Sequence, residues 1–373
     1  MKSARIKEMG ESELNRIIQG DTLEVLKTLP AESVDCIITS PPYYGLRDYG
    51  TAKWEGGNID CEHEGVSLGN NRNGLSSGEV SRKANNPSIT SGDCIKCGAK
   101  RIDRQIGLEK SLAEYLDRML EITAELKRVL KPTGTLWWNH GDSYGAGARK
   151  TGVPDSLRPG TNKGNSKATP ENMRAQGYEK SLLLQAHRLI IRMIDEQGWI
   201  LRNQIIWHKP NVMPSSVKDR FTVDFEPVFF FSKSKKYWFE PQYEPYTEPM
   251  NRWGGDNLKA KGESKWDEGT GQESYRDRNM RPNSLGRNKR AVWKIATHPF
   301  KEAHFATFPE ALIEPMVKAG CPQGGVCLDP FFGAGTTGVV AKKLGRNYLG
   351  IELNKSYIEI AEKRIASIQI PML

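Results

Sequence analysis

The stretch VCLDPFFGAGTTGVVAKKLG, residues 326–345, constrains the fold of this chain more than any other. A short apolar run leads into a glycine-rich turn, and a segment of helical spacing follows. This is the order of a buried strand, a tight turn and a helix. Because parallel neighbours in a sheet need a long crossover between them, a strand that passes directly into a helix indicates a parallel sheet covered by helices. The stretch therefore predicts an α/β protein.

The rest of the chain shows the same alternation of apolar runs and amphipathic segments, without an internal repeat. It opens with a strand, a helix closed by Pro30 and a second strand, which is the unit of a parallel sheet. The expected strands are 15–21, 33–40, 135–142, 199–209, 227–239, 326–331 and 347–353, and the expected helices are 22–30, 111–130, 181–197, 308–320, 337–345 and 356–368. We therefore expect a doubly wound, mostly parallel, Rossmann-like sheet.

Three polar segments interrupt this alternation. Residues 51–105 are rich in Gly, Asn and Ser, residues 145–178 contain almost no apolar side chains, and residues 240–290 are rich in Arg and Lys. We expect 145–178 to be a mobile basic loop, because such a segment cannot bury apolar surface. The catalytic core is assigned to 1–50, 106–144, 179–239 and 291–373.

Charge and hydropathy narrow the class of protein. The net charge of +9 suits a protein that binds a polyanion, and equally a surface that is merely well solvated, so both interpretations stay open. The chain contains no apolar run of about 18 residues, and its charged N-terminus lacks the apolar region of a secretory signal. We expect an intracellular protein without a membrane partner, whose six cysteines are thiols or metal ligands.

The glycine turn has the spacing of a nucleotide-binding loop. Gly333, Gly335 and Gly338 follow the pattern G-x-G-x-x-G, and Glu352 ends the next strand, where an acid contacts ribose hydroxyls. Alone, this pattern also fits a nicotinamide dinucleotide or a simple tight turn. Asp329 just before the glycines favours a cationic ligand, because a carboxylate would repel a pyrophosphate. S-adenosylmethionine, with its amino acid, ribose and sulfonium, fits these residues better.

Two motifs together make a family resemblance clear. TSPPYY (39–44) and DPFFGAGTT (329–337) resemble the N4-cytosine and N6-adenine amino-methyltransferases of DNA, and so do further stretches within 204–239, 291–295, 304–320 and 345–354. The resemblance covers roughly two-thirds of the chain and fails mainly in the three polar segments. The catalytic motif precedes the cofactor loop, which is the order of the β group of these enzymes. The sheet is then circularly permuted, so that strand 15–21 follows strand 347–353 in space.

The resemblance implies the cofactor site. HFATFP (304–309) is similar to the family segment along the methionine end of the cofactor, although these residues also suit a helix start. Asp21 is expected near the adenine. The expected cofactor-binding residues are Asp21, Thr39, His304, Phe305, Phe308, Asp329, Pro330, Phe331, Gly333, Gly335, Thr336, Thr337 and Glu352.

The expected catalytic residues are Ser40, Pro41, Pro42 and Tyr43. The Ser40 hydroxyl and the Pro41 carbonyl would each accept one N–H of a flipped-out base amine, Pro42 stiffens the turn, and the Tyr43 ring holds the base. Serine at position 40 favours N4 of cytosine, because adenine enzymes of the family more often have Asp or Asn there. N6-adenine methylation is the alternative, and a protein amide-nitrogen methyltransferase is a remote one.

A Cys-x-His pair and a Cys-x-x-Cys pair lie within 51–105. Cys61, His63, Cys94 and Cys97 suit tetrahedral Zn²⁺, and the alternative is unpaired thiols in a loop. The metal would be structural, because this insertion has little core of its own.

The resemblance also implies partners. We expect double-stranded DNA as the substrate, with contacts from 44–50, from the basic loop and from 240–290 as the target-recognition region. A partner restriction endonuclease and an oligomer stay open. The expected compartment is the cytoplasm of a prokaryotic cell or of a phage-infected host.

Overall fold

The computed structural model describes nine parts of the chain. These are residues 13–45, 53–58, 60–63, 94, 96–102, 105–145, 178–245, 285–297 and 307–368. All statements on structure below concern these residues. Among the helices of these parts, none is long and apolar enough to cross a membrane.

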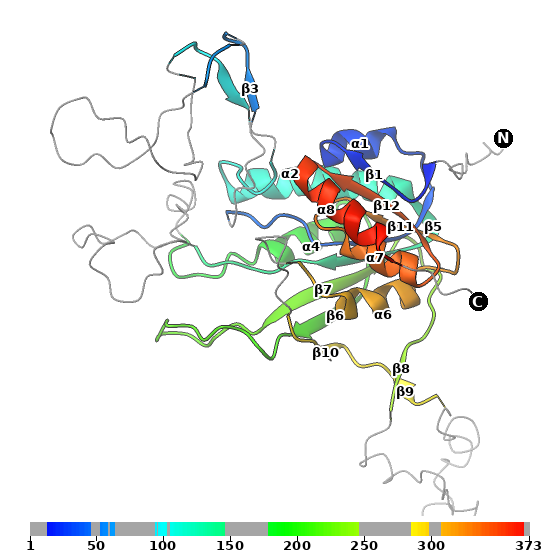
Figure 1. Cartoon of the computed structure of the whole chain (residues 1–373). Coiled ribbons are helices and arrows are strands. Elements are labelled where there is room, and N and C mark those ends of the chain that lie inside the picture. The colour runs from blue at the N-terminus through cyan, green and yellow to red at the C-terminus, as the bar shows by residue number, and fades with distance from the viewer. Residues whose placement is uncertain are drawn as a thin grey trace, which may run out of the picture.

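One mixed sheet forms the centre of the molecule (Figure 1). Its order is β1-β12-β11-β2-β5-β7-β6-β10, and β7 is the one strand in it that runs antiparallel to its neighbours. The strands are β1 (Arg16–Gln19), β2 (Val34–Thr39), β5 (Leu130–Asn139), β6 (Ile200–His208), β7 (Phe225–Ser232), β10 (Val292–Lys294), β11 (Val326–Asp329) and β12 (Asn347–Glu352). Two small antiparallel pairs lie outside it, β3 (Lys53–Glu55) with β4 (Lys100–Ile102), and β8 (Tyr243–Glu244) with β9 (Arg287–Asn288).

Helices cover both faces of the sheet (Figure 1). One layer holds α1 (Thr22–Thr28), α2 (Leu112–Val129) and α4 (Gln185–Asp195), and the other holds α6 (Glu310–Gly320), α7 (Thr336–Lys343) and α8 (Lys355–Ala366). Successive side chains of a strand point to opposite faces. In β2, Ile37 therefore packs with the first layer, while Cys36 and Ile38 pack with the second. The predicted α/β class is confirmed.

The first strand of the chain completes the sheet beside the last one. β1 pairs in parallel with β12, with Arg16 opposite Leu349 and Gln19 opposite Glu352. The strand that would follow β12 in an unpermuted fold therefore comes from the N-terminal part of the chain. This is the permuted order that the motifs predicted.

Several elements differ from the sequence-based expectation, among them α4, β7 and β10. Helix α4 begins at Gln185 rather than at 181, because Leu184 adopts a left-handed backbone with φ of 51° and its N–H donates to Asp142. Strand β7 ends at Ser232, where the hydroxyl donates to the carbonyl of Ser234 and turns the chain out of the sheet. The edge strand β10 was not expected as a strand, because it has only three residues, too few to show a period.

Candidate active site

The two motifs meet at the carboxyl edge of the parallel strands. β2 and β11 are neighbours in the sheet, with Cys36 opposite Cys327, so the residues after both strands emerge side by side. The Thr39 hydroxyl donates to the Asp329 carboxylate at 2.7 Å. Open α/β sheets bind their ligands at this edge, where the strand order reverses. Ser40, directly after Thr39, therefore lies next to the glycine loop.

Asp329 holds three elements together. It is fully buried, and it accepts hydrogen bonds from the Thr39 and Thr337 hydroxyls, each at 2.7 Å, and from the Phe331 N–H at 3.1 Å. Burial raises the pKa of this carboxyl to about 6, while the three donors act in the opposite direction. Its observed partners are thus the end of β2, the turn and helix α7. Its contact with a cofactor amino group stays a prediction.

The glycine loop has the backbone shape that its sequence requires. Gly335 precedes helix α7 with a left-handed φ of 77°, and a Cβ there would lie 2.7 Å from the Cβ of Ala361 in α8. Gly333 donates its N–H to the Glu352 carboxylate at 2.8 Å. Glu352 also accepts from the Asn354 N–H at 2.8 Å, and burial raises its pKa. The acid at the end of β12 therefore lies against the loop, as the motif predicted, and its contact with a ribose stays a prediction.

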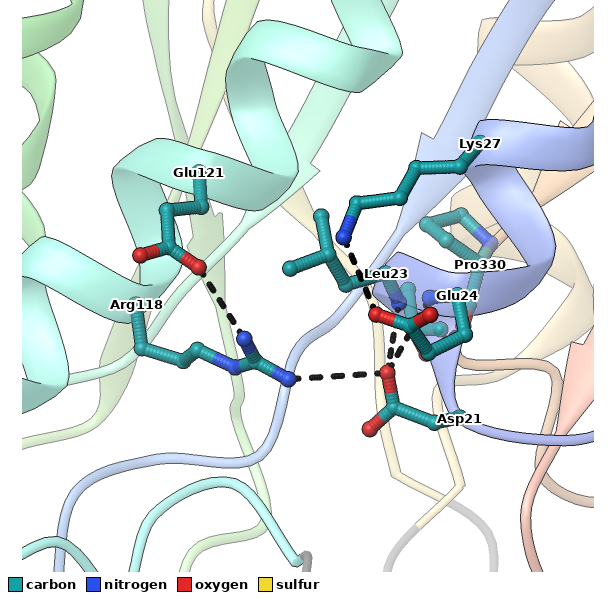
Figure 2. A network of polar contacts seen from close by, with 8 residues as sticks. Asp21, Leu23, Glu24, Lys27, Arg118, Glu121 and Pro330 are labelled. Atoms are coloured by element: carbon teal, nitrogen blue, oxygen red, sulfur yellow. Dashed lines mark hydrogen bonds and ion pairs between the residues drawn. The ribbon is translucent and has the colours of Figure 1, made fainter.

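Asp21 lies on the other side of the same loop. Figure 2 shows its carboxylate at the start of α1, where it accepts from the N–H groups of Leu23 and Glu24 at 3.0 and 3.2 Å. Arg118 of α2 reaches it at 3.5 Å. The next residue, Thr22, donates to the carbonyl of Pro330 at 2.8 Å. Helix α1 is thus fastened to the glycine-loop motif. The expected position of Asp21 near the adenine stays a prediction.

The other predicted cofactor residues are placed as follows. Phe331 packs against the first-layer core, and Phe308 packs against the second. Thr336 is buried, and its hydroxyl accepts from Arg364 at 3.2 Å. His304 and Phe305 lie outside the described residues.

The turn Ser40–Tyr43, whose catalytic role stays a prediction, is supported by aromatic and polar side chains. The Tyr43 ring stacks on His140, with centroids 5.0 Å apart and an interplanar angle of 24°. Its hydroxyl lies 3.3 Å from the Ser40 hydroxyl and donates to Glu226 at 3.1 Å. Glu226 in turn pairs with Lys209. The turn is therefore held by one side chain of β7 and by the residues that directly follow β5 and β6.

A second set of contacts fixes the backbone of the turn. The Tyr115 hydroxyl lies 2.9 Å from the Pro42 carbonyl, to which it donates, and 3.2 Å from Nε2 of His140. The Trp138 indole N–H donates to Nδ1 of His140 at 3.2 Å. Because an indole only donates, Nδ1 is an acceptor and Nε2 carries the proton. Full burial lowers the pKa of His140 to about 3, which agrees with this neutral tautomer.

The comparison with known sequences identifies the family. A family model described as DNA methylase matches residues 34–363. The chain belongs to this DNA methylase family. It is 37% identical over 349 residues to the Type II methyltransferase M.Cfr9I of Citrobacter freundii, across 94% of this chain and 87% of that protein. It is 34% identical over 350 residues to M.SmaI of Serratia marcescens, across 94% of this chain and 90% of that protein.

The fold of this methylase matches a solved structure. The PvuII DNA methyltransferase (cytosine-N4-specific) superposes with a TM-score of 0.52 and 18% sequence identity, covering 96% of this chain and 87% of that one. At this identity the likeness concerns the fold alone. It confirms the methyltransferase-type sheet, and the family match confirms the resemblance seen in the two motifs.

The methylase also carries, beside β3 and β4, a group of four side chains that could hold a metal ion. The ligand atoms of Cys61, His63, Cys94 and Cys97 all lie within 4.8 Å of one another. The structure thus gathers the four residues that the sequence paired, although the two pairs are more than thirty residues apart.

Sequence reasoning missed two residues of the methylase site, Glu226 and Lys209. Glu226 stands at the start of the apolar run EPVFFF, and Lys209 ends IIWHK. Two signals for these residues were available in the sequence. One was an acid at the start of an otherwise apolar strand, and the other was a lysine at the end of another strand. Their pairing depends on β6 and β7 being antiparallel neighbours, which the sequence alone does not reveal.

Proposed function

We propose that this chain transfers a methyl group from S-adenosylmethionine to the exocyclic amine of a DNA base, with N4 of cytosine as the favoured target. The observation that carries this proposal is the bond from Thr39 to Asp329, which fixes the Ser-Pro-Pro-Tyr turn against the glycine loop. Methyl transfer needs the amine and the methyl group in line and in contact. Two motifs 290 residues apart in the chain meet at one point of the sheet edge.

The residues of the turn would prepare the amine. An exocyclic amine is a poor nucleophile, because its lone pair is delocalised into the ring. The Ser40 hydroxyl oxygen and the Pro41 carbonyl would accept its two N–H groups and favour a tetrahedral nitrogen. The half-buried Tyr43 stacks one ring face on His140. Its other face would be the platform for a flipped base.

The glycine loop would hold the cofactor, whose chemistry is to supply an electrophilic methyl group on its sulfonium. Gly333, where an added Cβ would meet no protein atom closer than 4.0 Å, would let the backbone approach the ligand closely. Glu352 and Asp21 border the loop. The carboxylates would suit the ribose hydroxyls and the adenine amine. No covalent bond between protein and DNA is needed in this reaction.

The decisive experiment measures transfer of label from S-adenosyl-[methyl-³H]methionine to duplex DNA of mixed sequence. Mass spectrometry of the digested nucleosides then distinguishes the target. We expect N4-methylcytosine, because residue 40 is serine. N6-methyladenine would establish the alternative target, and label in no DNA would overturn the proposed activity. Label in protein would support the remote amide-nitrogen alternative.

We further propose that Cys61, His63, Cys94 and Cys97 bind one structural Zn²⁺. Tetrahedral zinc, with bonds of about 2.3 Å to sulfur and about 2.0 Å to nitrogen, places two thiolates about 3.8 Å apart. Sγ of Cys61 and Sγ of Cys94 are 3.9 Å apart, and Sγ of Cys97 lies 3.3 Å from Nδ1 of His63. The donor set and its spacing thus fit the metal.

The backbone around these ligands has the form of a tight metal-binding turn. The Gly98 N–H donates to the carbonyl of Cys94 at 2.8 Å, and Gly98 adopts a left-handed φ of 74°. The Cys94 N–H donates to the Ala99 carbonyl at 2.6 Å. This turn places both cysteines of the Cys-x-x-Cys pair on the same side, where one ion can reach them.

Metal analysis of the purified protein should find about one zinc per chain, a stoichiometry set by the four ligands. Replacing both Cys94 and Cys97 by serine should remove it, and we expect the insertion to become sensitive to protease. Cys321→Ser is the matched control, because this buried thiol lies outside the ligand group and its loss should leave the zinc in place. The proposal would be contradicted if the purified wild-type protein contained no zinc and if chelators left its resistance to protease unchanged.

Double-stranded DNA is the proposed substrate, and the Type II names of the relatives support a partner restriction endonuclease for this chain. The regions expected to contact DNA are 44–50, 145–178 and 240–290, and their residues 46–50, 146–177 and 246–284 lie outside the described residues. The net charge of +9 supports phosphate contacts. The rate of methyl transfer to DNA should therefore fall as the salt concentration is raised.

A further inference from the structure

Four side chains form a continuous polar chain that ends at the catalytic serine. Lys209, at the end of β6, pairs with the Glu226 carboxylate in β7. The other oxygen of Glu226 accepts from the Tyr43 hydroxyl at 3.1 Å, and this hydroxyl lies 3.3 Å from that of Ser40. Lys209 and Glu226 have side chains only 17% and 22% exposed, so water screens their pairing weakly.

The order of donors along this chain is fixed by chemistry. An ammonium group only donates, and an ionised carboxylate only accepts. Glu226 therefore takes the single proton of the Tyr43 hydroxyl. The Tyr43 oxygen is left as an acceptor toward Ser40, so the Ser40 hydroxyl must donate in that contact. Its lone pairs then remain free to accept from another group.

This orientation is the one that the proposed reaction requires. A serine hydroxyl that accepts an N–H from the base amine must direct its own proton elsewhere. We propose that Glu226 and Lys209 are positioning residues that direct the Ser40 proton to Tyr43 and thereby present the Ser40 lone pairs to the target amine. The inference rests on the proposed amino-methyltransferase function and deepens it, since neither residue touches the reacting atoms.

The environment of Tyr43 supports this role for its hydroxyl. Stacking on His140 fixes the ring, and a Cβ at Gly141 would lie 2.8 Å from Cε2 of Tyr43, so this ring edge has no room to move. Burial, with the charge of Glu226 adding to it, raises the pKa of Tyr43 well above its ordinary value, so the phenol keeps its proton. Tyr43 thus combines a ring for the base with a hydroxyl for Ser40.

Glu226→Gln tests the direction in which these hydrogen bonds are donated, because glutamine has almost the same shape as glutamate. Because Lys209 only donates, it takes the amide oxygen of the new side chain, and the NH₂ group faces Tyr43. Tyr43 must then donate to Ser40, which occupies a Ser40 lone pair and turns its proton toward the amine. The direction of donation is thus reversed, while the hydrogen bonds between these side chains are kept. We expect kcat to fall about 100-fold, as when one transition-state hydrogen bond is lost.

Tyr43→Phe is the matched variant, because it keeps the ring and removes the hydroxyl. Ser40 is then free to rotate and still accept, so we expect a smaller loss of kcat, about 10-fold, comparable to one neutral hydrogen bond. The double variant Y43F/E226Q lacks the hydroxyl of residue 43, so the reversed direction of donation cannot reach Ser40. Its kcat should therefore match that of Y43F and exceed that of E226Q.

The measurements are kcat at saturating DNA and cofactor, the KM for S-adenosylmethionine, and Tm, for wild type and these three variants. We expect the KM to change little in all three variants. Tm should fall in the two variants with E226Q, because the weakly screened Lys209 ammonium loses its carboxylate partner. The inference would be overturned if E226Q or Y43F kept the kcat of the wild type, or if the fold-losses of kcat in the two single variants multiplied in the double variant. Either result would leave the proposed function intact. Absence of transfer by the wild-type protein would overturn the proposed function, and this inference with it.

Discussion

Replacing Ser40 by alanine is expected to lower kcat for methyl transfer by about 100-fold to 1,000-fold. The substitution removes one of the two acceptors for the base amine and leaves the Pro41 carbonyl alone. Binding of S-adenosylmethionine should change less than about 2-fold, because the Ser40 hydroxyl contacts Tyr43 rather than the glycine loop. Single-turnover transfer of labelled methyl and a separate cofactor titration measure the two quantities.

Ser33→Ala is the control for this prediction. The Ser33 hydroxyl donates to the Pro30 carbonyl at 2.8 Å, just before β2, at the edge of the sheet opposite Ser40. Its loss should leave kcat within about 2-fold of the wild-type value, since it touches no group of the site. If Ser40→Ala kept most of the wild-type kcat, the acceptor role of this hydroxyl would be wrong.

Replacing Asp329 by alanine is expected to have the largest effect on stability. Two hydroxyls and one backbone N–H would lose their acceptor in a fully buried place. An unsatisfied buried donor costs about 1–3 kcal/mol, so the free energy of unfolding should fall by about 3–5 kcal/mol. Cofactor affinity should be lost as well, because Asp329 fixes the loop to β2. Urea unfolding and isothermal titration calorimetry measure both effects.

Asp35→Ala separates the two effects of the previous variant. Asp35 lies near the other end of β2, pairs with Lys131 at 2.8 Å and accepts from the Val326 N–H at 2.9 Å. Its loss should also reduce the free energy of unfolding, yet leave cofactor affinity unchanged in the folded protein. Equal loss of affinity in both variants would show that Asp329 acts through stability alone.

Asp329 should also give the protein a defined pH dependence. Burial raises its pKa from 3.8 to about 6, so between these values the folded state binds more protons than the unfolded state. Its contribution to the free energy of unfolding should therefore decrease as pH rises through this window, by up to roughly 3 kcal/mol. Measured from pH 4 to pH 7, the difference in stability between wild type and Asp329→Asn should fall with pH. A constant difference would contradict the assigned pKa.

Local motifs were predictable from the sequence because their chemistry is local. The strand, glycine turn and helix around Gly333–Gly335 follow from apolar spacing and from backbone conformations that favour glycine. The turn from Ser40 to Tyr43 follows from two prolines after an apolar run. Even the two ligand pairs of the metal group are recognisable, since each pair is defined by a spacing of two or three residues.

Contacts between distant segments were decided only by the tertiary structure. Thr39 and Asp329 are 290 residues apart, and Tyr43 and Glu226 are 183 apart, so no local pattern records either pairing. Each depends on the strand order, with β2 beside β11 in the first case and β5 alone between β2 and β7 in the second. The sequence by itself determined the two motifs to which we assign the chemistry. The order of the strands in the sheet decided how the residues of these motifs are held. A hydrogen bond depends on a distance of about 3 Å in space and not on the separation of its partners along the chain.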